Sequence, residues 1–205
     1  MPAPQTFTGG FLLTNAYLIE LPEGGHLLID APGDTAAWLE EIGITPTALL
    51  LTHQHFDHVI DAAAIAAKGV PIYAWSAFSR DLTCEEVVRQ WGMPFTVDPF
   101  AVDHLLEGTD SLAIGGLALG LLHVPGHSPD SVTFHDPAGV QLFAGDTLFA
   151  GSTGRGDLPG GDLELLCRGI VEKIYPLPPA TRVYPGHGES TDIGTERAEN
   201  EVIRA

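Results

Sequence analysis

The stretch LLLTHQHFDHVI, residues 49–60, places three histidines and an aspartate within six positions, directly after an apolar run. On an extended strand end, His53 and His55 lie two residues apart and project to the same face, where two imidazoles can converge on one ion. Asp57 and His58 follow at the expected start of a helix, where the chain turns and can offer a carboxylate and an imidazole to a second ion. The stretch therefore predicts a metal site at the end of a buried strand.

The alternatives to a two-metal site are a chance cluster of surface histidines and a site for a single ion. A chance HxHxDH pattern is expected in roughly one chain per thousand of this length and composition. Four donors this close together over-supply a single ion, so we favour two. On the same strand geometry, Thr52, Gln54 and Phe56 are expected to face away from the ions.

Three further donors recur downstream, each in a loop that follows a strand-like run. His127 lies in HVPGHSPDS, Asp146 in FAGDTLF and His187 in VYPGHGES. Functional side chains are often carried by loops of this kind on a rigid scaffold. Asp30, in LLIDAPGD, has a similar position near the start of the chain.

The order of apolar runs and helix-like windows predicts a layered α/β domain, because strands mix with helices throughout the chain. No linker divides it, so we expect one domain over residues 1–205. Asp34 is the expected N-cap of the first helix. The run 47–75 reads as a strand, a helix and a parallel strand. Strands are expected at 15–21, 26–30, 47–53, 70–75, 111–114, 117–124, 131–136, 140–145 and 181–187, and helices at 35–43, 57–69, 84–92, 162–174 and 194–204.

Charge and composition narrow the function classes. The formal net charge of −18 opposes binding to a nucleic-acid backbone. No apolar run reaches membrane-spanning length, and the first twenty residues carry no signal-peptide pattern. Cys84 and Cys167 lie far apart in the sequence, so a disulfide framework is not expected. A cytoplasmic protein with a small-molecule substrate is the expectation, while the oligomeric state stays open.

The ordered set of HxHxDH, a histidine, an aspartate and a last histidine resembles the metallo-β-lactamase superfamily over roughly residues 11–200. The resemblance implies a four-layer αββα sandwich, with the metals at one edge of two sheets packed face to face. It also implies that Asp30 contacts and orients the metal ligands without binding a metal itself. The implied ligands are His53, His55 and His127 for one metal and Asp57, His58 and His187 for the second, with Asp146 bridging both.

Within the superfamily, GDTLFAGSTGRGDLPGGD and VYPGHGESTDIGTERAEN look most like the short, glyoxalase II-like hydrolases. This likeness implies hydrolysis of a thioester such as S-lactoylglutathione by a hydroxide that bridges the metals. Asp57 is the expected orienter or base for the hydroxide, and Asp146 fixes the metal separation. The donors suit two Zn²⁺ first, with Fe²⁺ or Mn²⁺ as alternatives. The best-known β-lactamase branches use a cysteine as a metal ligand. Neither cysteine here lies near a motif, so a true β-lactamase is disfavoured.

Arg155 aligns with a basic residue that contacts the thiol portion of the substrate in glyoxalase II. The equal alternative is a loop arginine paired with Asp157. The chain ends at Ala205, where longer glyoxalase II enzymes continue into a helical segment with further basic glutathione contacts, so the physiological thiol stays open.

Two other functions fit the same pattern. One is a persulfide dioxygenase of the same superfamily, in which His53, His127 and Asp146 would hold a single Fe²⁺. The other is a metal-binding module without turnover. Of the remaining histidines, His26 and His104 are expected to be structural or surface groups, and His123 and His135 lie on or beside strands near the site.

Overall fold

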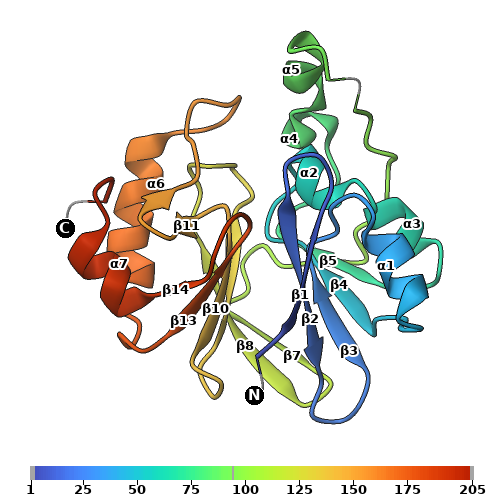
Figure 1. Ribbon diagram of the computed structural model, residues 1–205, viewed down its shortest axis with the longest axis horizontal. Coiled ribbons are helices and arrows are strands. Elements are labelled where there is room, and N and C mark those ends of the chain that lie inside the picture. Colours follow the sequence, from blue (N-terminus) through green and yellow to red (C-terminus); the bar gives the residue numbers. More distant parts are fainter. Residues whose placement is uncertain (1–2, 94, 204–205) are drawn as a thin grey trace.

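A computed structural model describes residues 3–93 and 95–203 (Figure 1). Two mixed sheets pack face to face and helices cover their outer faces, which confirms the predicted αββα sandwich. Residues 1–2, 94 and 204–205, which the expected single domain of residues 1–205 includes, lie outside the described residues. None of the described helices is long and apolar enough to cross a membrane.

The first sheet has the strand order β1-β2-β3-β4-β5-β6. Strands β1 to β3 pair antiparallel, whereas β3, β4, β5 and β6 run parallel. The expected strand–helix–strand unit is therefore present between β4 and β5. The strands are β1 (Gln5–Gly9), β2 (Thr14–Glu20), β3 (His26–Ile29), β4 (Ala48–Leu50), β5 (Ile72–Ala74) and β6 (His104–Leu105).

The second sheet has the order β14-β13-β10-β9-β8-β7 and is antiparallel except for the β10–β13 pair. A separate hairpin joins β11 to β12. The strands are β7 (Ser111–Ile114), β8 (Leu117–His123), β9 (Val132–Asp136), β10 (Gln141–Gly145), β11 (Leu148–Phe149), β12 (Ser152–Thr153), β13 (Arg182–Pro185) and β14 (Thr191–Asp192).

Three layers of apolar side chains hold the sandwich together. The central layer lies between the sheets, where Ile29 and Leu50 of the first meet Phe134 and Phe143 of the second. The outer layers join each sheet to its helices. The helices are α1 (Thr35–Glu41), α2 (Phe56–Val59), α3 (Ala62–Ala66), α4 (Arg80–Thr83), α5 (Glu85–Gln90), α6 (Leu163–Gly169), which continues into a π-helical turn at Ile170–Ile174, and α7 (Ile193–Glu199).

The helix expected at 57–69 is interrupted between α2 and α3, and the loop after β3 explains the break. The Ala31 N–H donates to the His58 carbonyl (2.8 Å), and the Asp61 N–H donates to the Ala31 carbonyl (3.0 Å). A continuous helix would need both of these backbone groups for its own ladder. The interruption therefore ties the HxHxDH segment to the loop that follows Asp30.

Two expected helix ends also differ. Asp34 lies at the N-cap of α1 but makes no side-chain cap; instead the Asp61 carboxylate accepts from the Ala36 N–H at 2.9 Å. The helix expected at 194–204 ends at Glu199, since Asn200 is extended and its side-chain oxygen accepts from the N–H groups of Val202 and Ile203. Residue 204 lies outside the described residues.

Candidate metal centre

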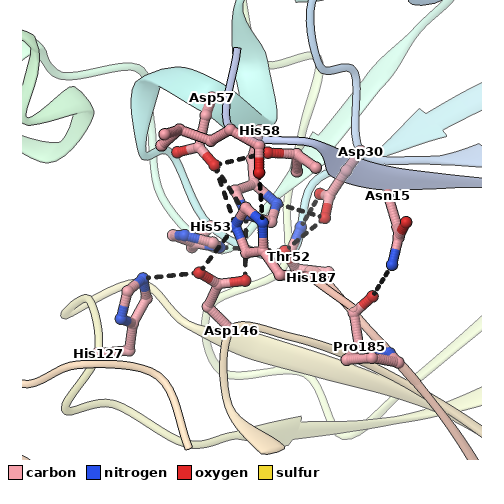
Figure 2. Close-up of polar contacts among 12 residues, drawn as sticks. Asn15, Asp30, Thr52, His53, Asp57, His58, His127, Asp146, Pro185 and His187 are labelled. Atoms are coloured by element: carbon pink, nitrogen blue, oxygen red, sulfur yellow. Dashed lines mark hydrogen bonds and ion pairs between the residues drawn. The ribbon is translucent and has the colours of Figure 1, made fainter. Parts of the chain in front are cut away.

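The candidate ligands come from segments that follow strands of both sheets, and their side chains lie close together (Figure 2). Strand β4 ends at Leu50, so His53 and His55 lie in the loop between β4 and α2 rather than on the strand end that the sequence predicted. Asp57 and His58 belong to α2. The second sheet contributes from the segments after its strands: His127 follows β8, Asp146 follows β10 and His187 follows β13.

The first donor group consists of His53, His55 and His127, whose ring nitrogens lie within 4.8 Å of one another. All three side chains are buried, and their Nε2 atoms have no hydrogen-bond partner. His127 Nδ1 donates to the Arg155 carbonyl at 2.8 Å, which leaves its Nε2 lone pair free. A histidine whose other nitrogen is held in this way is oriented to bind a metal.

The second donor group consists of Asp57, His58 and His187, again with ligand atoms within 4.8 Å. The His58 Nδ1 is 2.8 Å from Asp30 Oδ2, and the His187 Nδ1 is 3.2 Å from the Leu12 carbonyl. Both Nε2 atoms face carboxylates, because His187 Nε2 is 3.2 Å from Asp57 Oδ2 and His58 Nε2 is 3.6 Å from the same oxygen.

Asp146 lies between the two groups (Figure 2). Its Oδ2 is 3.5 Å from His127 Nε2 and 3.4 Å from His187 Nε2, and its Oδ1 is 3.2 Å from His58 Nε2. One carboxylate thus faces donors of both groups. The structure brings together all seven side chains that the resemblance implied as ligands.

Asp30 contacts the candidate ligand His58 and belongs to none of the donor groups among the described residues, as the family resemblance implied. Its φ of 60° is in the left-handed region, and the bend aims the carboxylate at the loop after β4. Oδ1 accepts from the Thr52 N–H and Oδ2 from the Thr52 hydroxyl, both at 2.8 Å. Because that hydroxyl donates to Asp30, it can accept from His53 Nδ1, which is 3.1 Å away. Asp30 therefore supports His58 directly and His53 through Thr52.

The expectation that Thr52 and Gln54 face away from the ligands assumed a strand. Thr52 turns toward Asp30 and His53, so that expectation is wrong for this residue. Gln54 does face away: its amide donates to the Ser76 and Ala77 carbonyls and accepts from the Ser79 N–H. Thr14 also contacts the site, because its hydroxyl donates to Asp57 Oδ2 at 2.7 Å, although nothing in TNAYLIE distinguishes it from an ordinary strand residue.

Two glycines permit the close approach of chain segments around the ligands. A Cβ on Gly186 would lie 2.1 Å from Asp146 Oδ1 and 2.6 Å from the His58 ring. A Cβ on Gly154 would lie 2.0 Å from the Asp146 carbonyl. The glycines in PGHG and STGRGD are therefore part of the site's construction.

The two donor groups differ in charge in the metal-free protein. Burial, reinforced by the neighbouring His127, lowers the pKa of His55 to about 3. Burial also lowers the pKa of His53 and His127. For His187, burial opposes protonation, but the Asp146 and Asp57 carboxylates outweigh it and raise the pKa to about 9.

The carboxylates of the centre remain ionised. Burial works against this for Asp57, yet His58 and His187 lower its pKa to about 2. Burial likewise opposes the ionisation of Asp146, but His58 and His187 outweigh burial and hold the Asp146 pKa well below its usual range. The proton on His187 therefore supplies positive charge to the second group, and a bound cation would supply that charge instead.

A cavity of about 450 Å³ opens beside the candidate ligands. His55, Asp57 and His187 are among its lining residues, and so are Cys84 and Arg155. The Arg155 side chain pairs with Asp157, the alternative considered from the sequence, while still lining the cavity. Cys84 belongs to none of the donor groups found among the described residues, and burial raises the pKa of its thiol to about 11.

The remaining described histidines lie outside the donor groups. His123 stacks on Trp75 and its Nε2 is 2.9 Å from the Pro129 carbonyl, in the loop that carries His127. His104 is exposed and stacks on Tyr73. Both cysteines are free, as expected.

The fold and the site define a class of protein. The sequence pattern of the metallo-beta-lactamase superfamily matches residues 9–187, so the chain belongs to this superfamily. The chain is 37% identical to the "Probable metallo-hydrolase YqgX" of Bacillus subtilis over 95% of its length and 94% of that protein. It is 34% identical to the "Hydroxyacylglutathione hydrolase GloC" of Haemophilus influenzae over 93% of each chain.

Solved structures support the same superfamily. The BLEG-1 B3 metallo-beta-lactamase is 37% identical with a TM-score of 0.89, over 98% of this chain and 100% of that one. TTHA1623 in a di-iron-bound form is 39% identical with a TM-score of 0.84, over 96% and 98% of the two chains. The chain is thus a superfamily member with His and Asp groups suited to divalent metals, which indicates a hydrolytic enzyme.

Proposed function

We propose that the protein is a binuclear metal-dependent hydrolase of thioesters such as S-lactoylglutathione or a related acyl-thiol. His53, His55 and His127 would hold one ion, and Asp57, His58 and His187 the other, with Asp146 shared between them. The observation that carries this proposal is that His53 and His55 Nε2 are buried without a hydrogen-bond partner, while His58 and His127 Nε2 face the Asp146 carboxylate at 3.2 and 3.5 Å without forming a hydrogen bond. Buried polar groups are seldom left without a partner, so the donor set fits metal ions.

When bound, two divalent ions would activate water as the nucleophile and polarise the carbonyl that it attacks. Imidazole and carboxylate donors suit Zn²⁺, which we propose first, with Fe²⁺ or Mn²⁺ as alternatives. The relative TTHA1623, solved in a di-iron-bound form, makes iron a serious candidate.

The two aspartates would have different tasks. Asp57 is ionised, lines the cavity and receives the Thr14 hydroxyl on Oδ2, so it can orient the attacking water and accept its proton. Asp146 is held between both donor groups and would fix their separation. Asp30 would orient His58 through its 2.8 Å contact.

A thioester suits this arrangement because its leaving thiol has a pKa of only ~8.5 and can depart as a thiolate without a strong general acid. The relative GloC, named as a hydroxyacylglutathione hydrolase, supports this substrate class. Arg155 lines the cavity and would contact the part of the substrate beyond the reacting carbonyl. We place the enzyme in the cytoplasm, in keeping with its two free cysteines.

The test combines metal analysis with turnover. We expect two ions per chain and oxygen-independent hydrolysis of S-lactoylglutathione. One iron per chain with oxygen uptake on glutathione persulfide would instead establish the dioxygenase that uses His53, His127 and Asp146. Full metal loading without turnover of thioesters, lactones or phosphodiesters would establish a silent metal-binding module.

A β-lactam belongs in the same panel because BLEG-1 is described as a B3 metallo-beta-lactamase. We expect β-lactam turnover to be much slower than thioester turnover. A nitrocefin rate that exceeds the S-lactoylglutathione rate would replace the thioester proposal by a lactamase one.

A further inference from the structure

The cavity beside the metal centre has mainly apolar walls, contributed by both halves of the molecule. Val88 and the adjoining Trp91 come from α5 and its C-terminal end, and Leu12 comes from the β1–β2 turn. Phe149 and Leu158 face them from the segment that precedes α6. Figure 1 shows α5 and this segment on opposite sides of the same end of the sandwich. These apolar side chains and the candidate ligands line the same cavity.

Arg155 is the only lysine or arginine among the described residues that line this cavity, and its charge is already compensated. Its Nε is 2.6 Å from Asp157 Oδ1 and an NH2 group is 2.8 Å from Oδ2, a two-point contact with both carboxylate oxygens. The guanidinium carbon also lies 5.4 Å from the centre of the Trp91 ring. Arg155 thus lines the cavity as a guanidinium whose charge is partly offset by Asp157 and which packs beside the Trp91 ring.

The arginines of the adjoining helices are compensated in the same way. Arg80 of α4 is 2.6 Å from Glu85, and Arg89 of α5 is 3.3 Å from Glu85 and 2.9 Å from Glu86. The chain as a whole has a formal net charge of −18. An anionic substrate tail would therefore meet apolar walls and a repulsive field, whereas an uncharged apolar tail would gain from leaving water.

We propose that this cavity takes thioesters whose body outside the reacting group is uncharged and apolar, and that Asp157 sets the preference by neutralising Arg155. The proposal rests on the proposed thioester hydrolysis for the identity of the reacting group. The proposed contact between Arg155 and the substrate remains possible, because a guanidinium paired with Asp157 can still contact an uncharged tail. Asp157 acts through Arg155 and is a positioning residue.

The direct test measures binding of two non-hydrolysable thioethers to the metal-loaded protein by isothermal titration calorimetry. S-hexylglutathione and S-hexyl-N-acetylcysteamine share the hexyl group but differ in the charge of the thiol portion. We expect the uncharged ligand to bind about tenfold tighter at low salt, and added salt to strengthen binding of the anionic ligand alone by screening repulsion. Tighter binding of S-hexylglutathione that weakens with salt would overturn the proposal.

An Asp157→Asn variant tests the assigned residue. Freeing the Arg155 charge should tighten binding of S-hexylglutathione by several-fold and leave the uncharged ligand unchanged. Glu164→Gln is the matched control, because it removes the same charge as Asp157→Asn. Glu164 lies in the first turn of α6, and Arg155 pairs with Asp157 instead. Equal effects of the two variants would show that only overall charge matters and would sink the role of Asp157.

Trp91 tests the apolar wall. Because its side chain is 53% exposed, Trp91→Ala should fold normally. We expect it to weaken binding of the uncharged thioether by about tenfold, and Trp91→Phe to restore most of the loss. Unchanged binding in Trp91→Ala would contradict an apolar recognition surface.

Parallel hydrolysis assays separate this proposal from the proposed function. If the thioethers bind as expected but neither S-lactoylglutathione nor S-lactoyl-N-acetylcysteamine is hydrolysed, thioester hydrolysis is wrong and the cavity preference belongs to another reaction. If both are hydrolysed and the glutathione ester has the higher kcat/KM, the proposed function holds and the apolar preference is wrong.

Discussion

The two halves of the proposed metal centre differ in burial and in charge. The His53, His55 and His127 half is buried and, without metal, holds neutral imidazoles that can accept a cation directly. The half built on Asp57, His58 and His187 is more open and already charged, with His187 protonated at neutral pH. Metal binding to the first half needs no proton release from His55, whereas binding to the second half must displace protons.

Asp146 lies close to donors of both halves, so its removal should have the largest effect. We expect Asp146→Ala to lower the metal content of both halves and to reduce kcat/KM by more than about a hundredfold, beyond the usual effect of removing a supporting residue. Metal analysis and S-lactoylglutathione hydrolysis on one preparation measure this. A variant that keeps two ions per chain would show that the carboxylate is not shared.

Asp30 should affect the halves unequally. It contacts His58 directly but reaches His53 only through Thr52. We expect Asp30→Asn to weaken metal binding to the second half by about 10- to 100-fold and to affect the first half less. Competitive titration with a chromophoric chelator resolves the two steps, and equal weakening of both would contradict the asymmetry.

The pH dependence of metal loading sharpens the comparison. The pKa of His187 is raised to about 9 in the metal-free protein, so below that pH a metal must displace its proton. Affinity of the second half should therefore fall as the pH falls, by about tenfold per pH unit for each proton displaced. The pKa of His55 is lowered to about 3, so it adds no such dependence to the first half above pH 5.

Titrations at pH 6, 7 and 8 in buffers of different ionisation enthalpy would count the protons. We expect release with the weaker binding step. Proton release with the tighter step alone would reverse the assignment of the charged half.

The smallest expected effect concerns Thr14, which donates to Asp57 Oδ2. Thr14→Val should reduce kcat/KM by a few-fold and leave the metal content unchanged, since it removes one hydrogen bond to a ligand and no ligand. Thr8→Val is a control on the neighbouring strand, because its hydroxyl donates to Asn15 instead. Equal losses in both variants would point to strand packing rather than to Asp57.

Sequence patterns were sufficient for much of the fold because apolar periodicity marks strands such as β8 and β10 clearly. The donors were also recognisable, since their residue types and loop contexts are unusual. Backbone contacts between distant segments were not recognisable: Ala31 interrupts the helix expected at 57–69, and the loop at His53 turns Thr52 toward Asp30. The Trp91–Arg155 contact likewise joins segments 64 residues apart, which no local pattern reports.

Removing His58 gives the most direct test of two-metal hydrolysis. Its side chain is fully buried, so His187→Ala, in the more open part of the same half, accompanies it, and the exposed His104→Ala is the control. In all three variants, metal content and S-lactoylglutathione hydrolysis are measured on the same sample. We predict that His58→Ala retains about one ion per chain and loses at least about a hundredfold in kcat/KM, while His104→Ala matches the parent protein. Loss of one ion with full hydrolysis retained would contradict the binuclear mechanism.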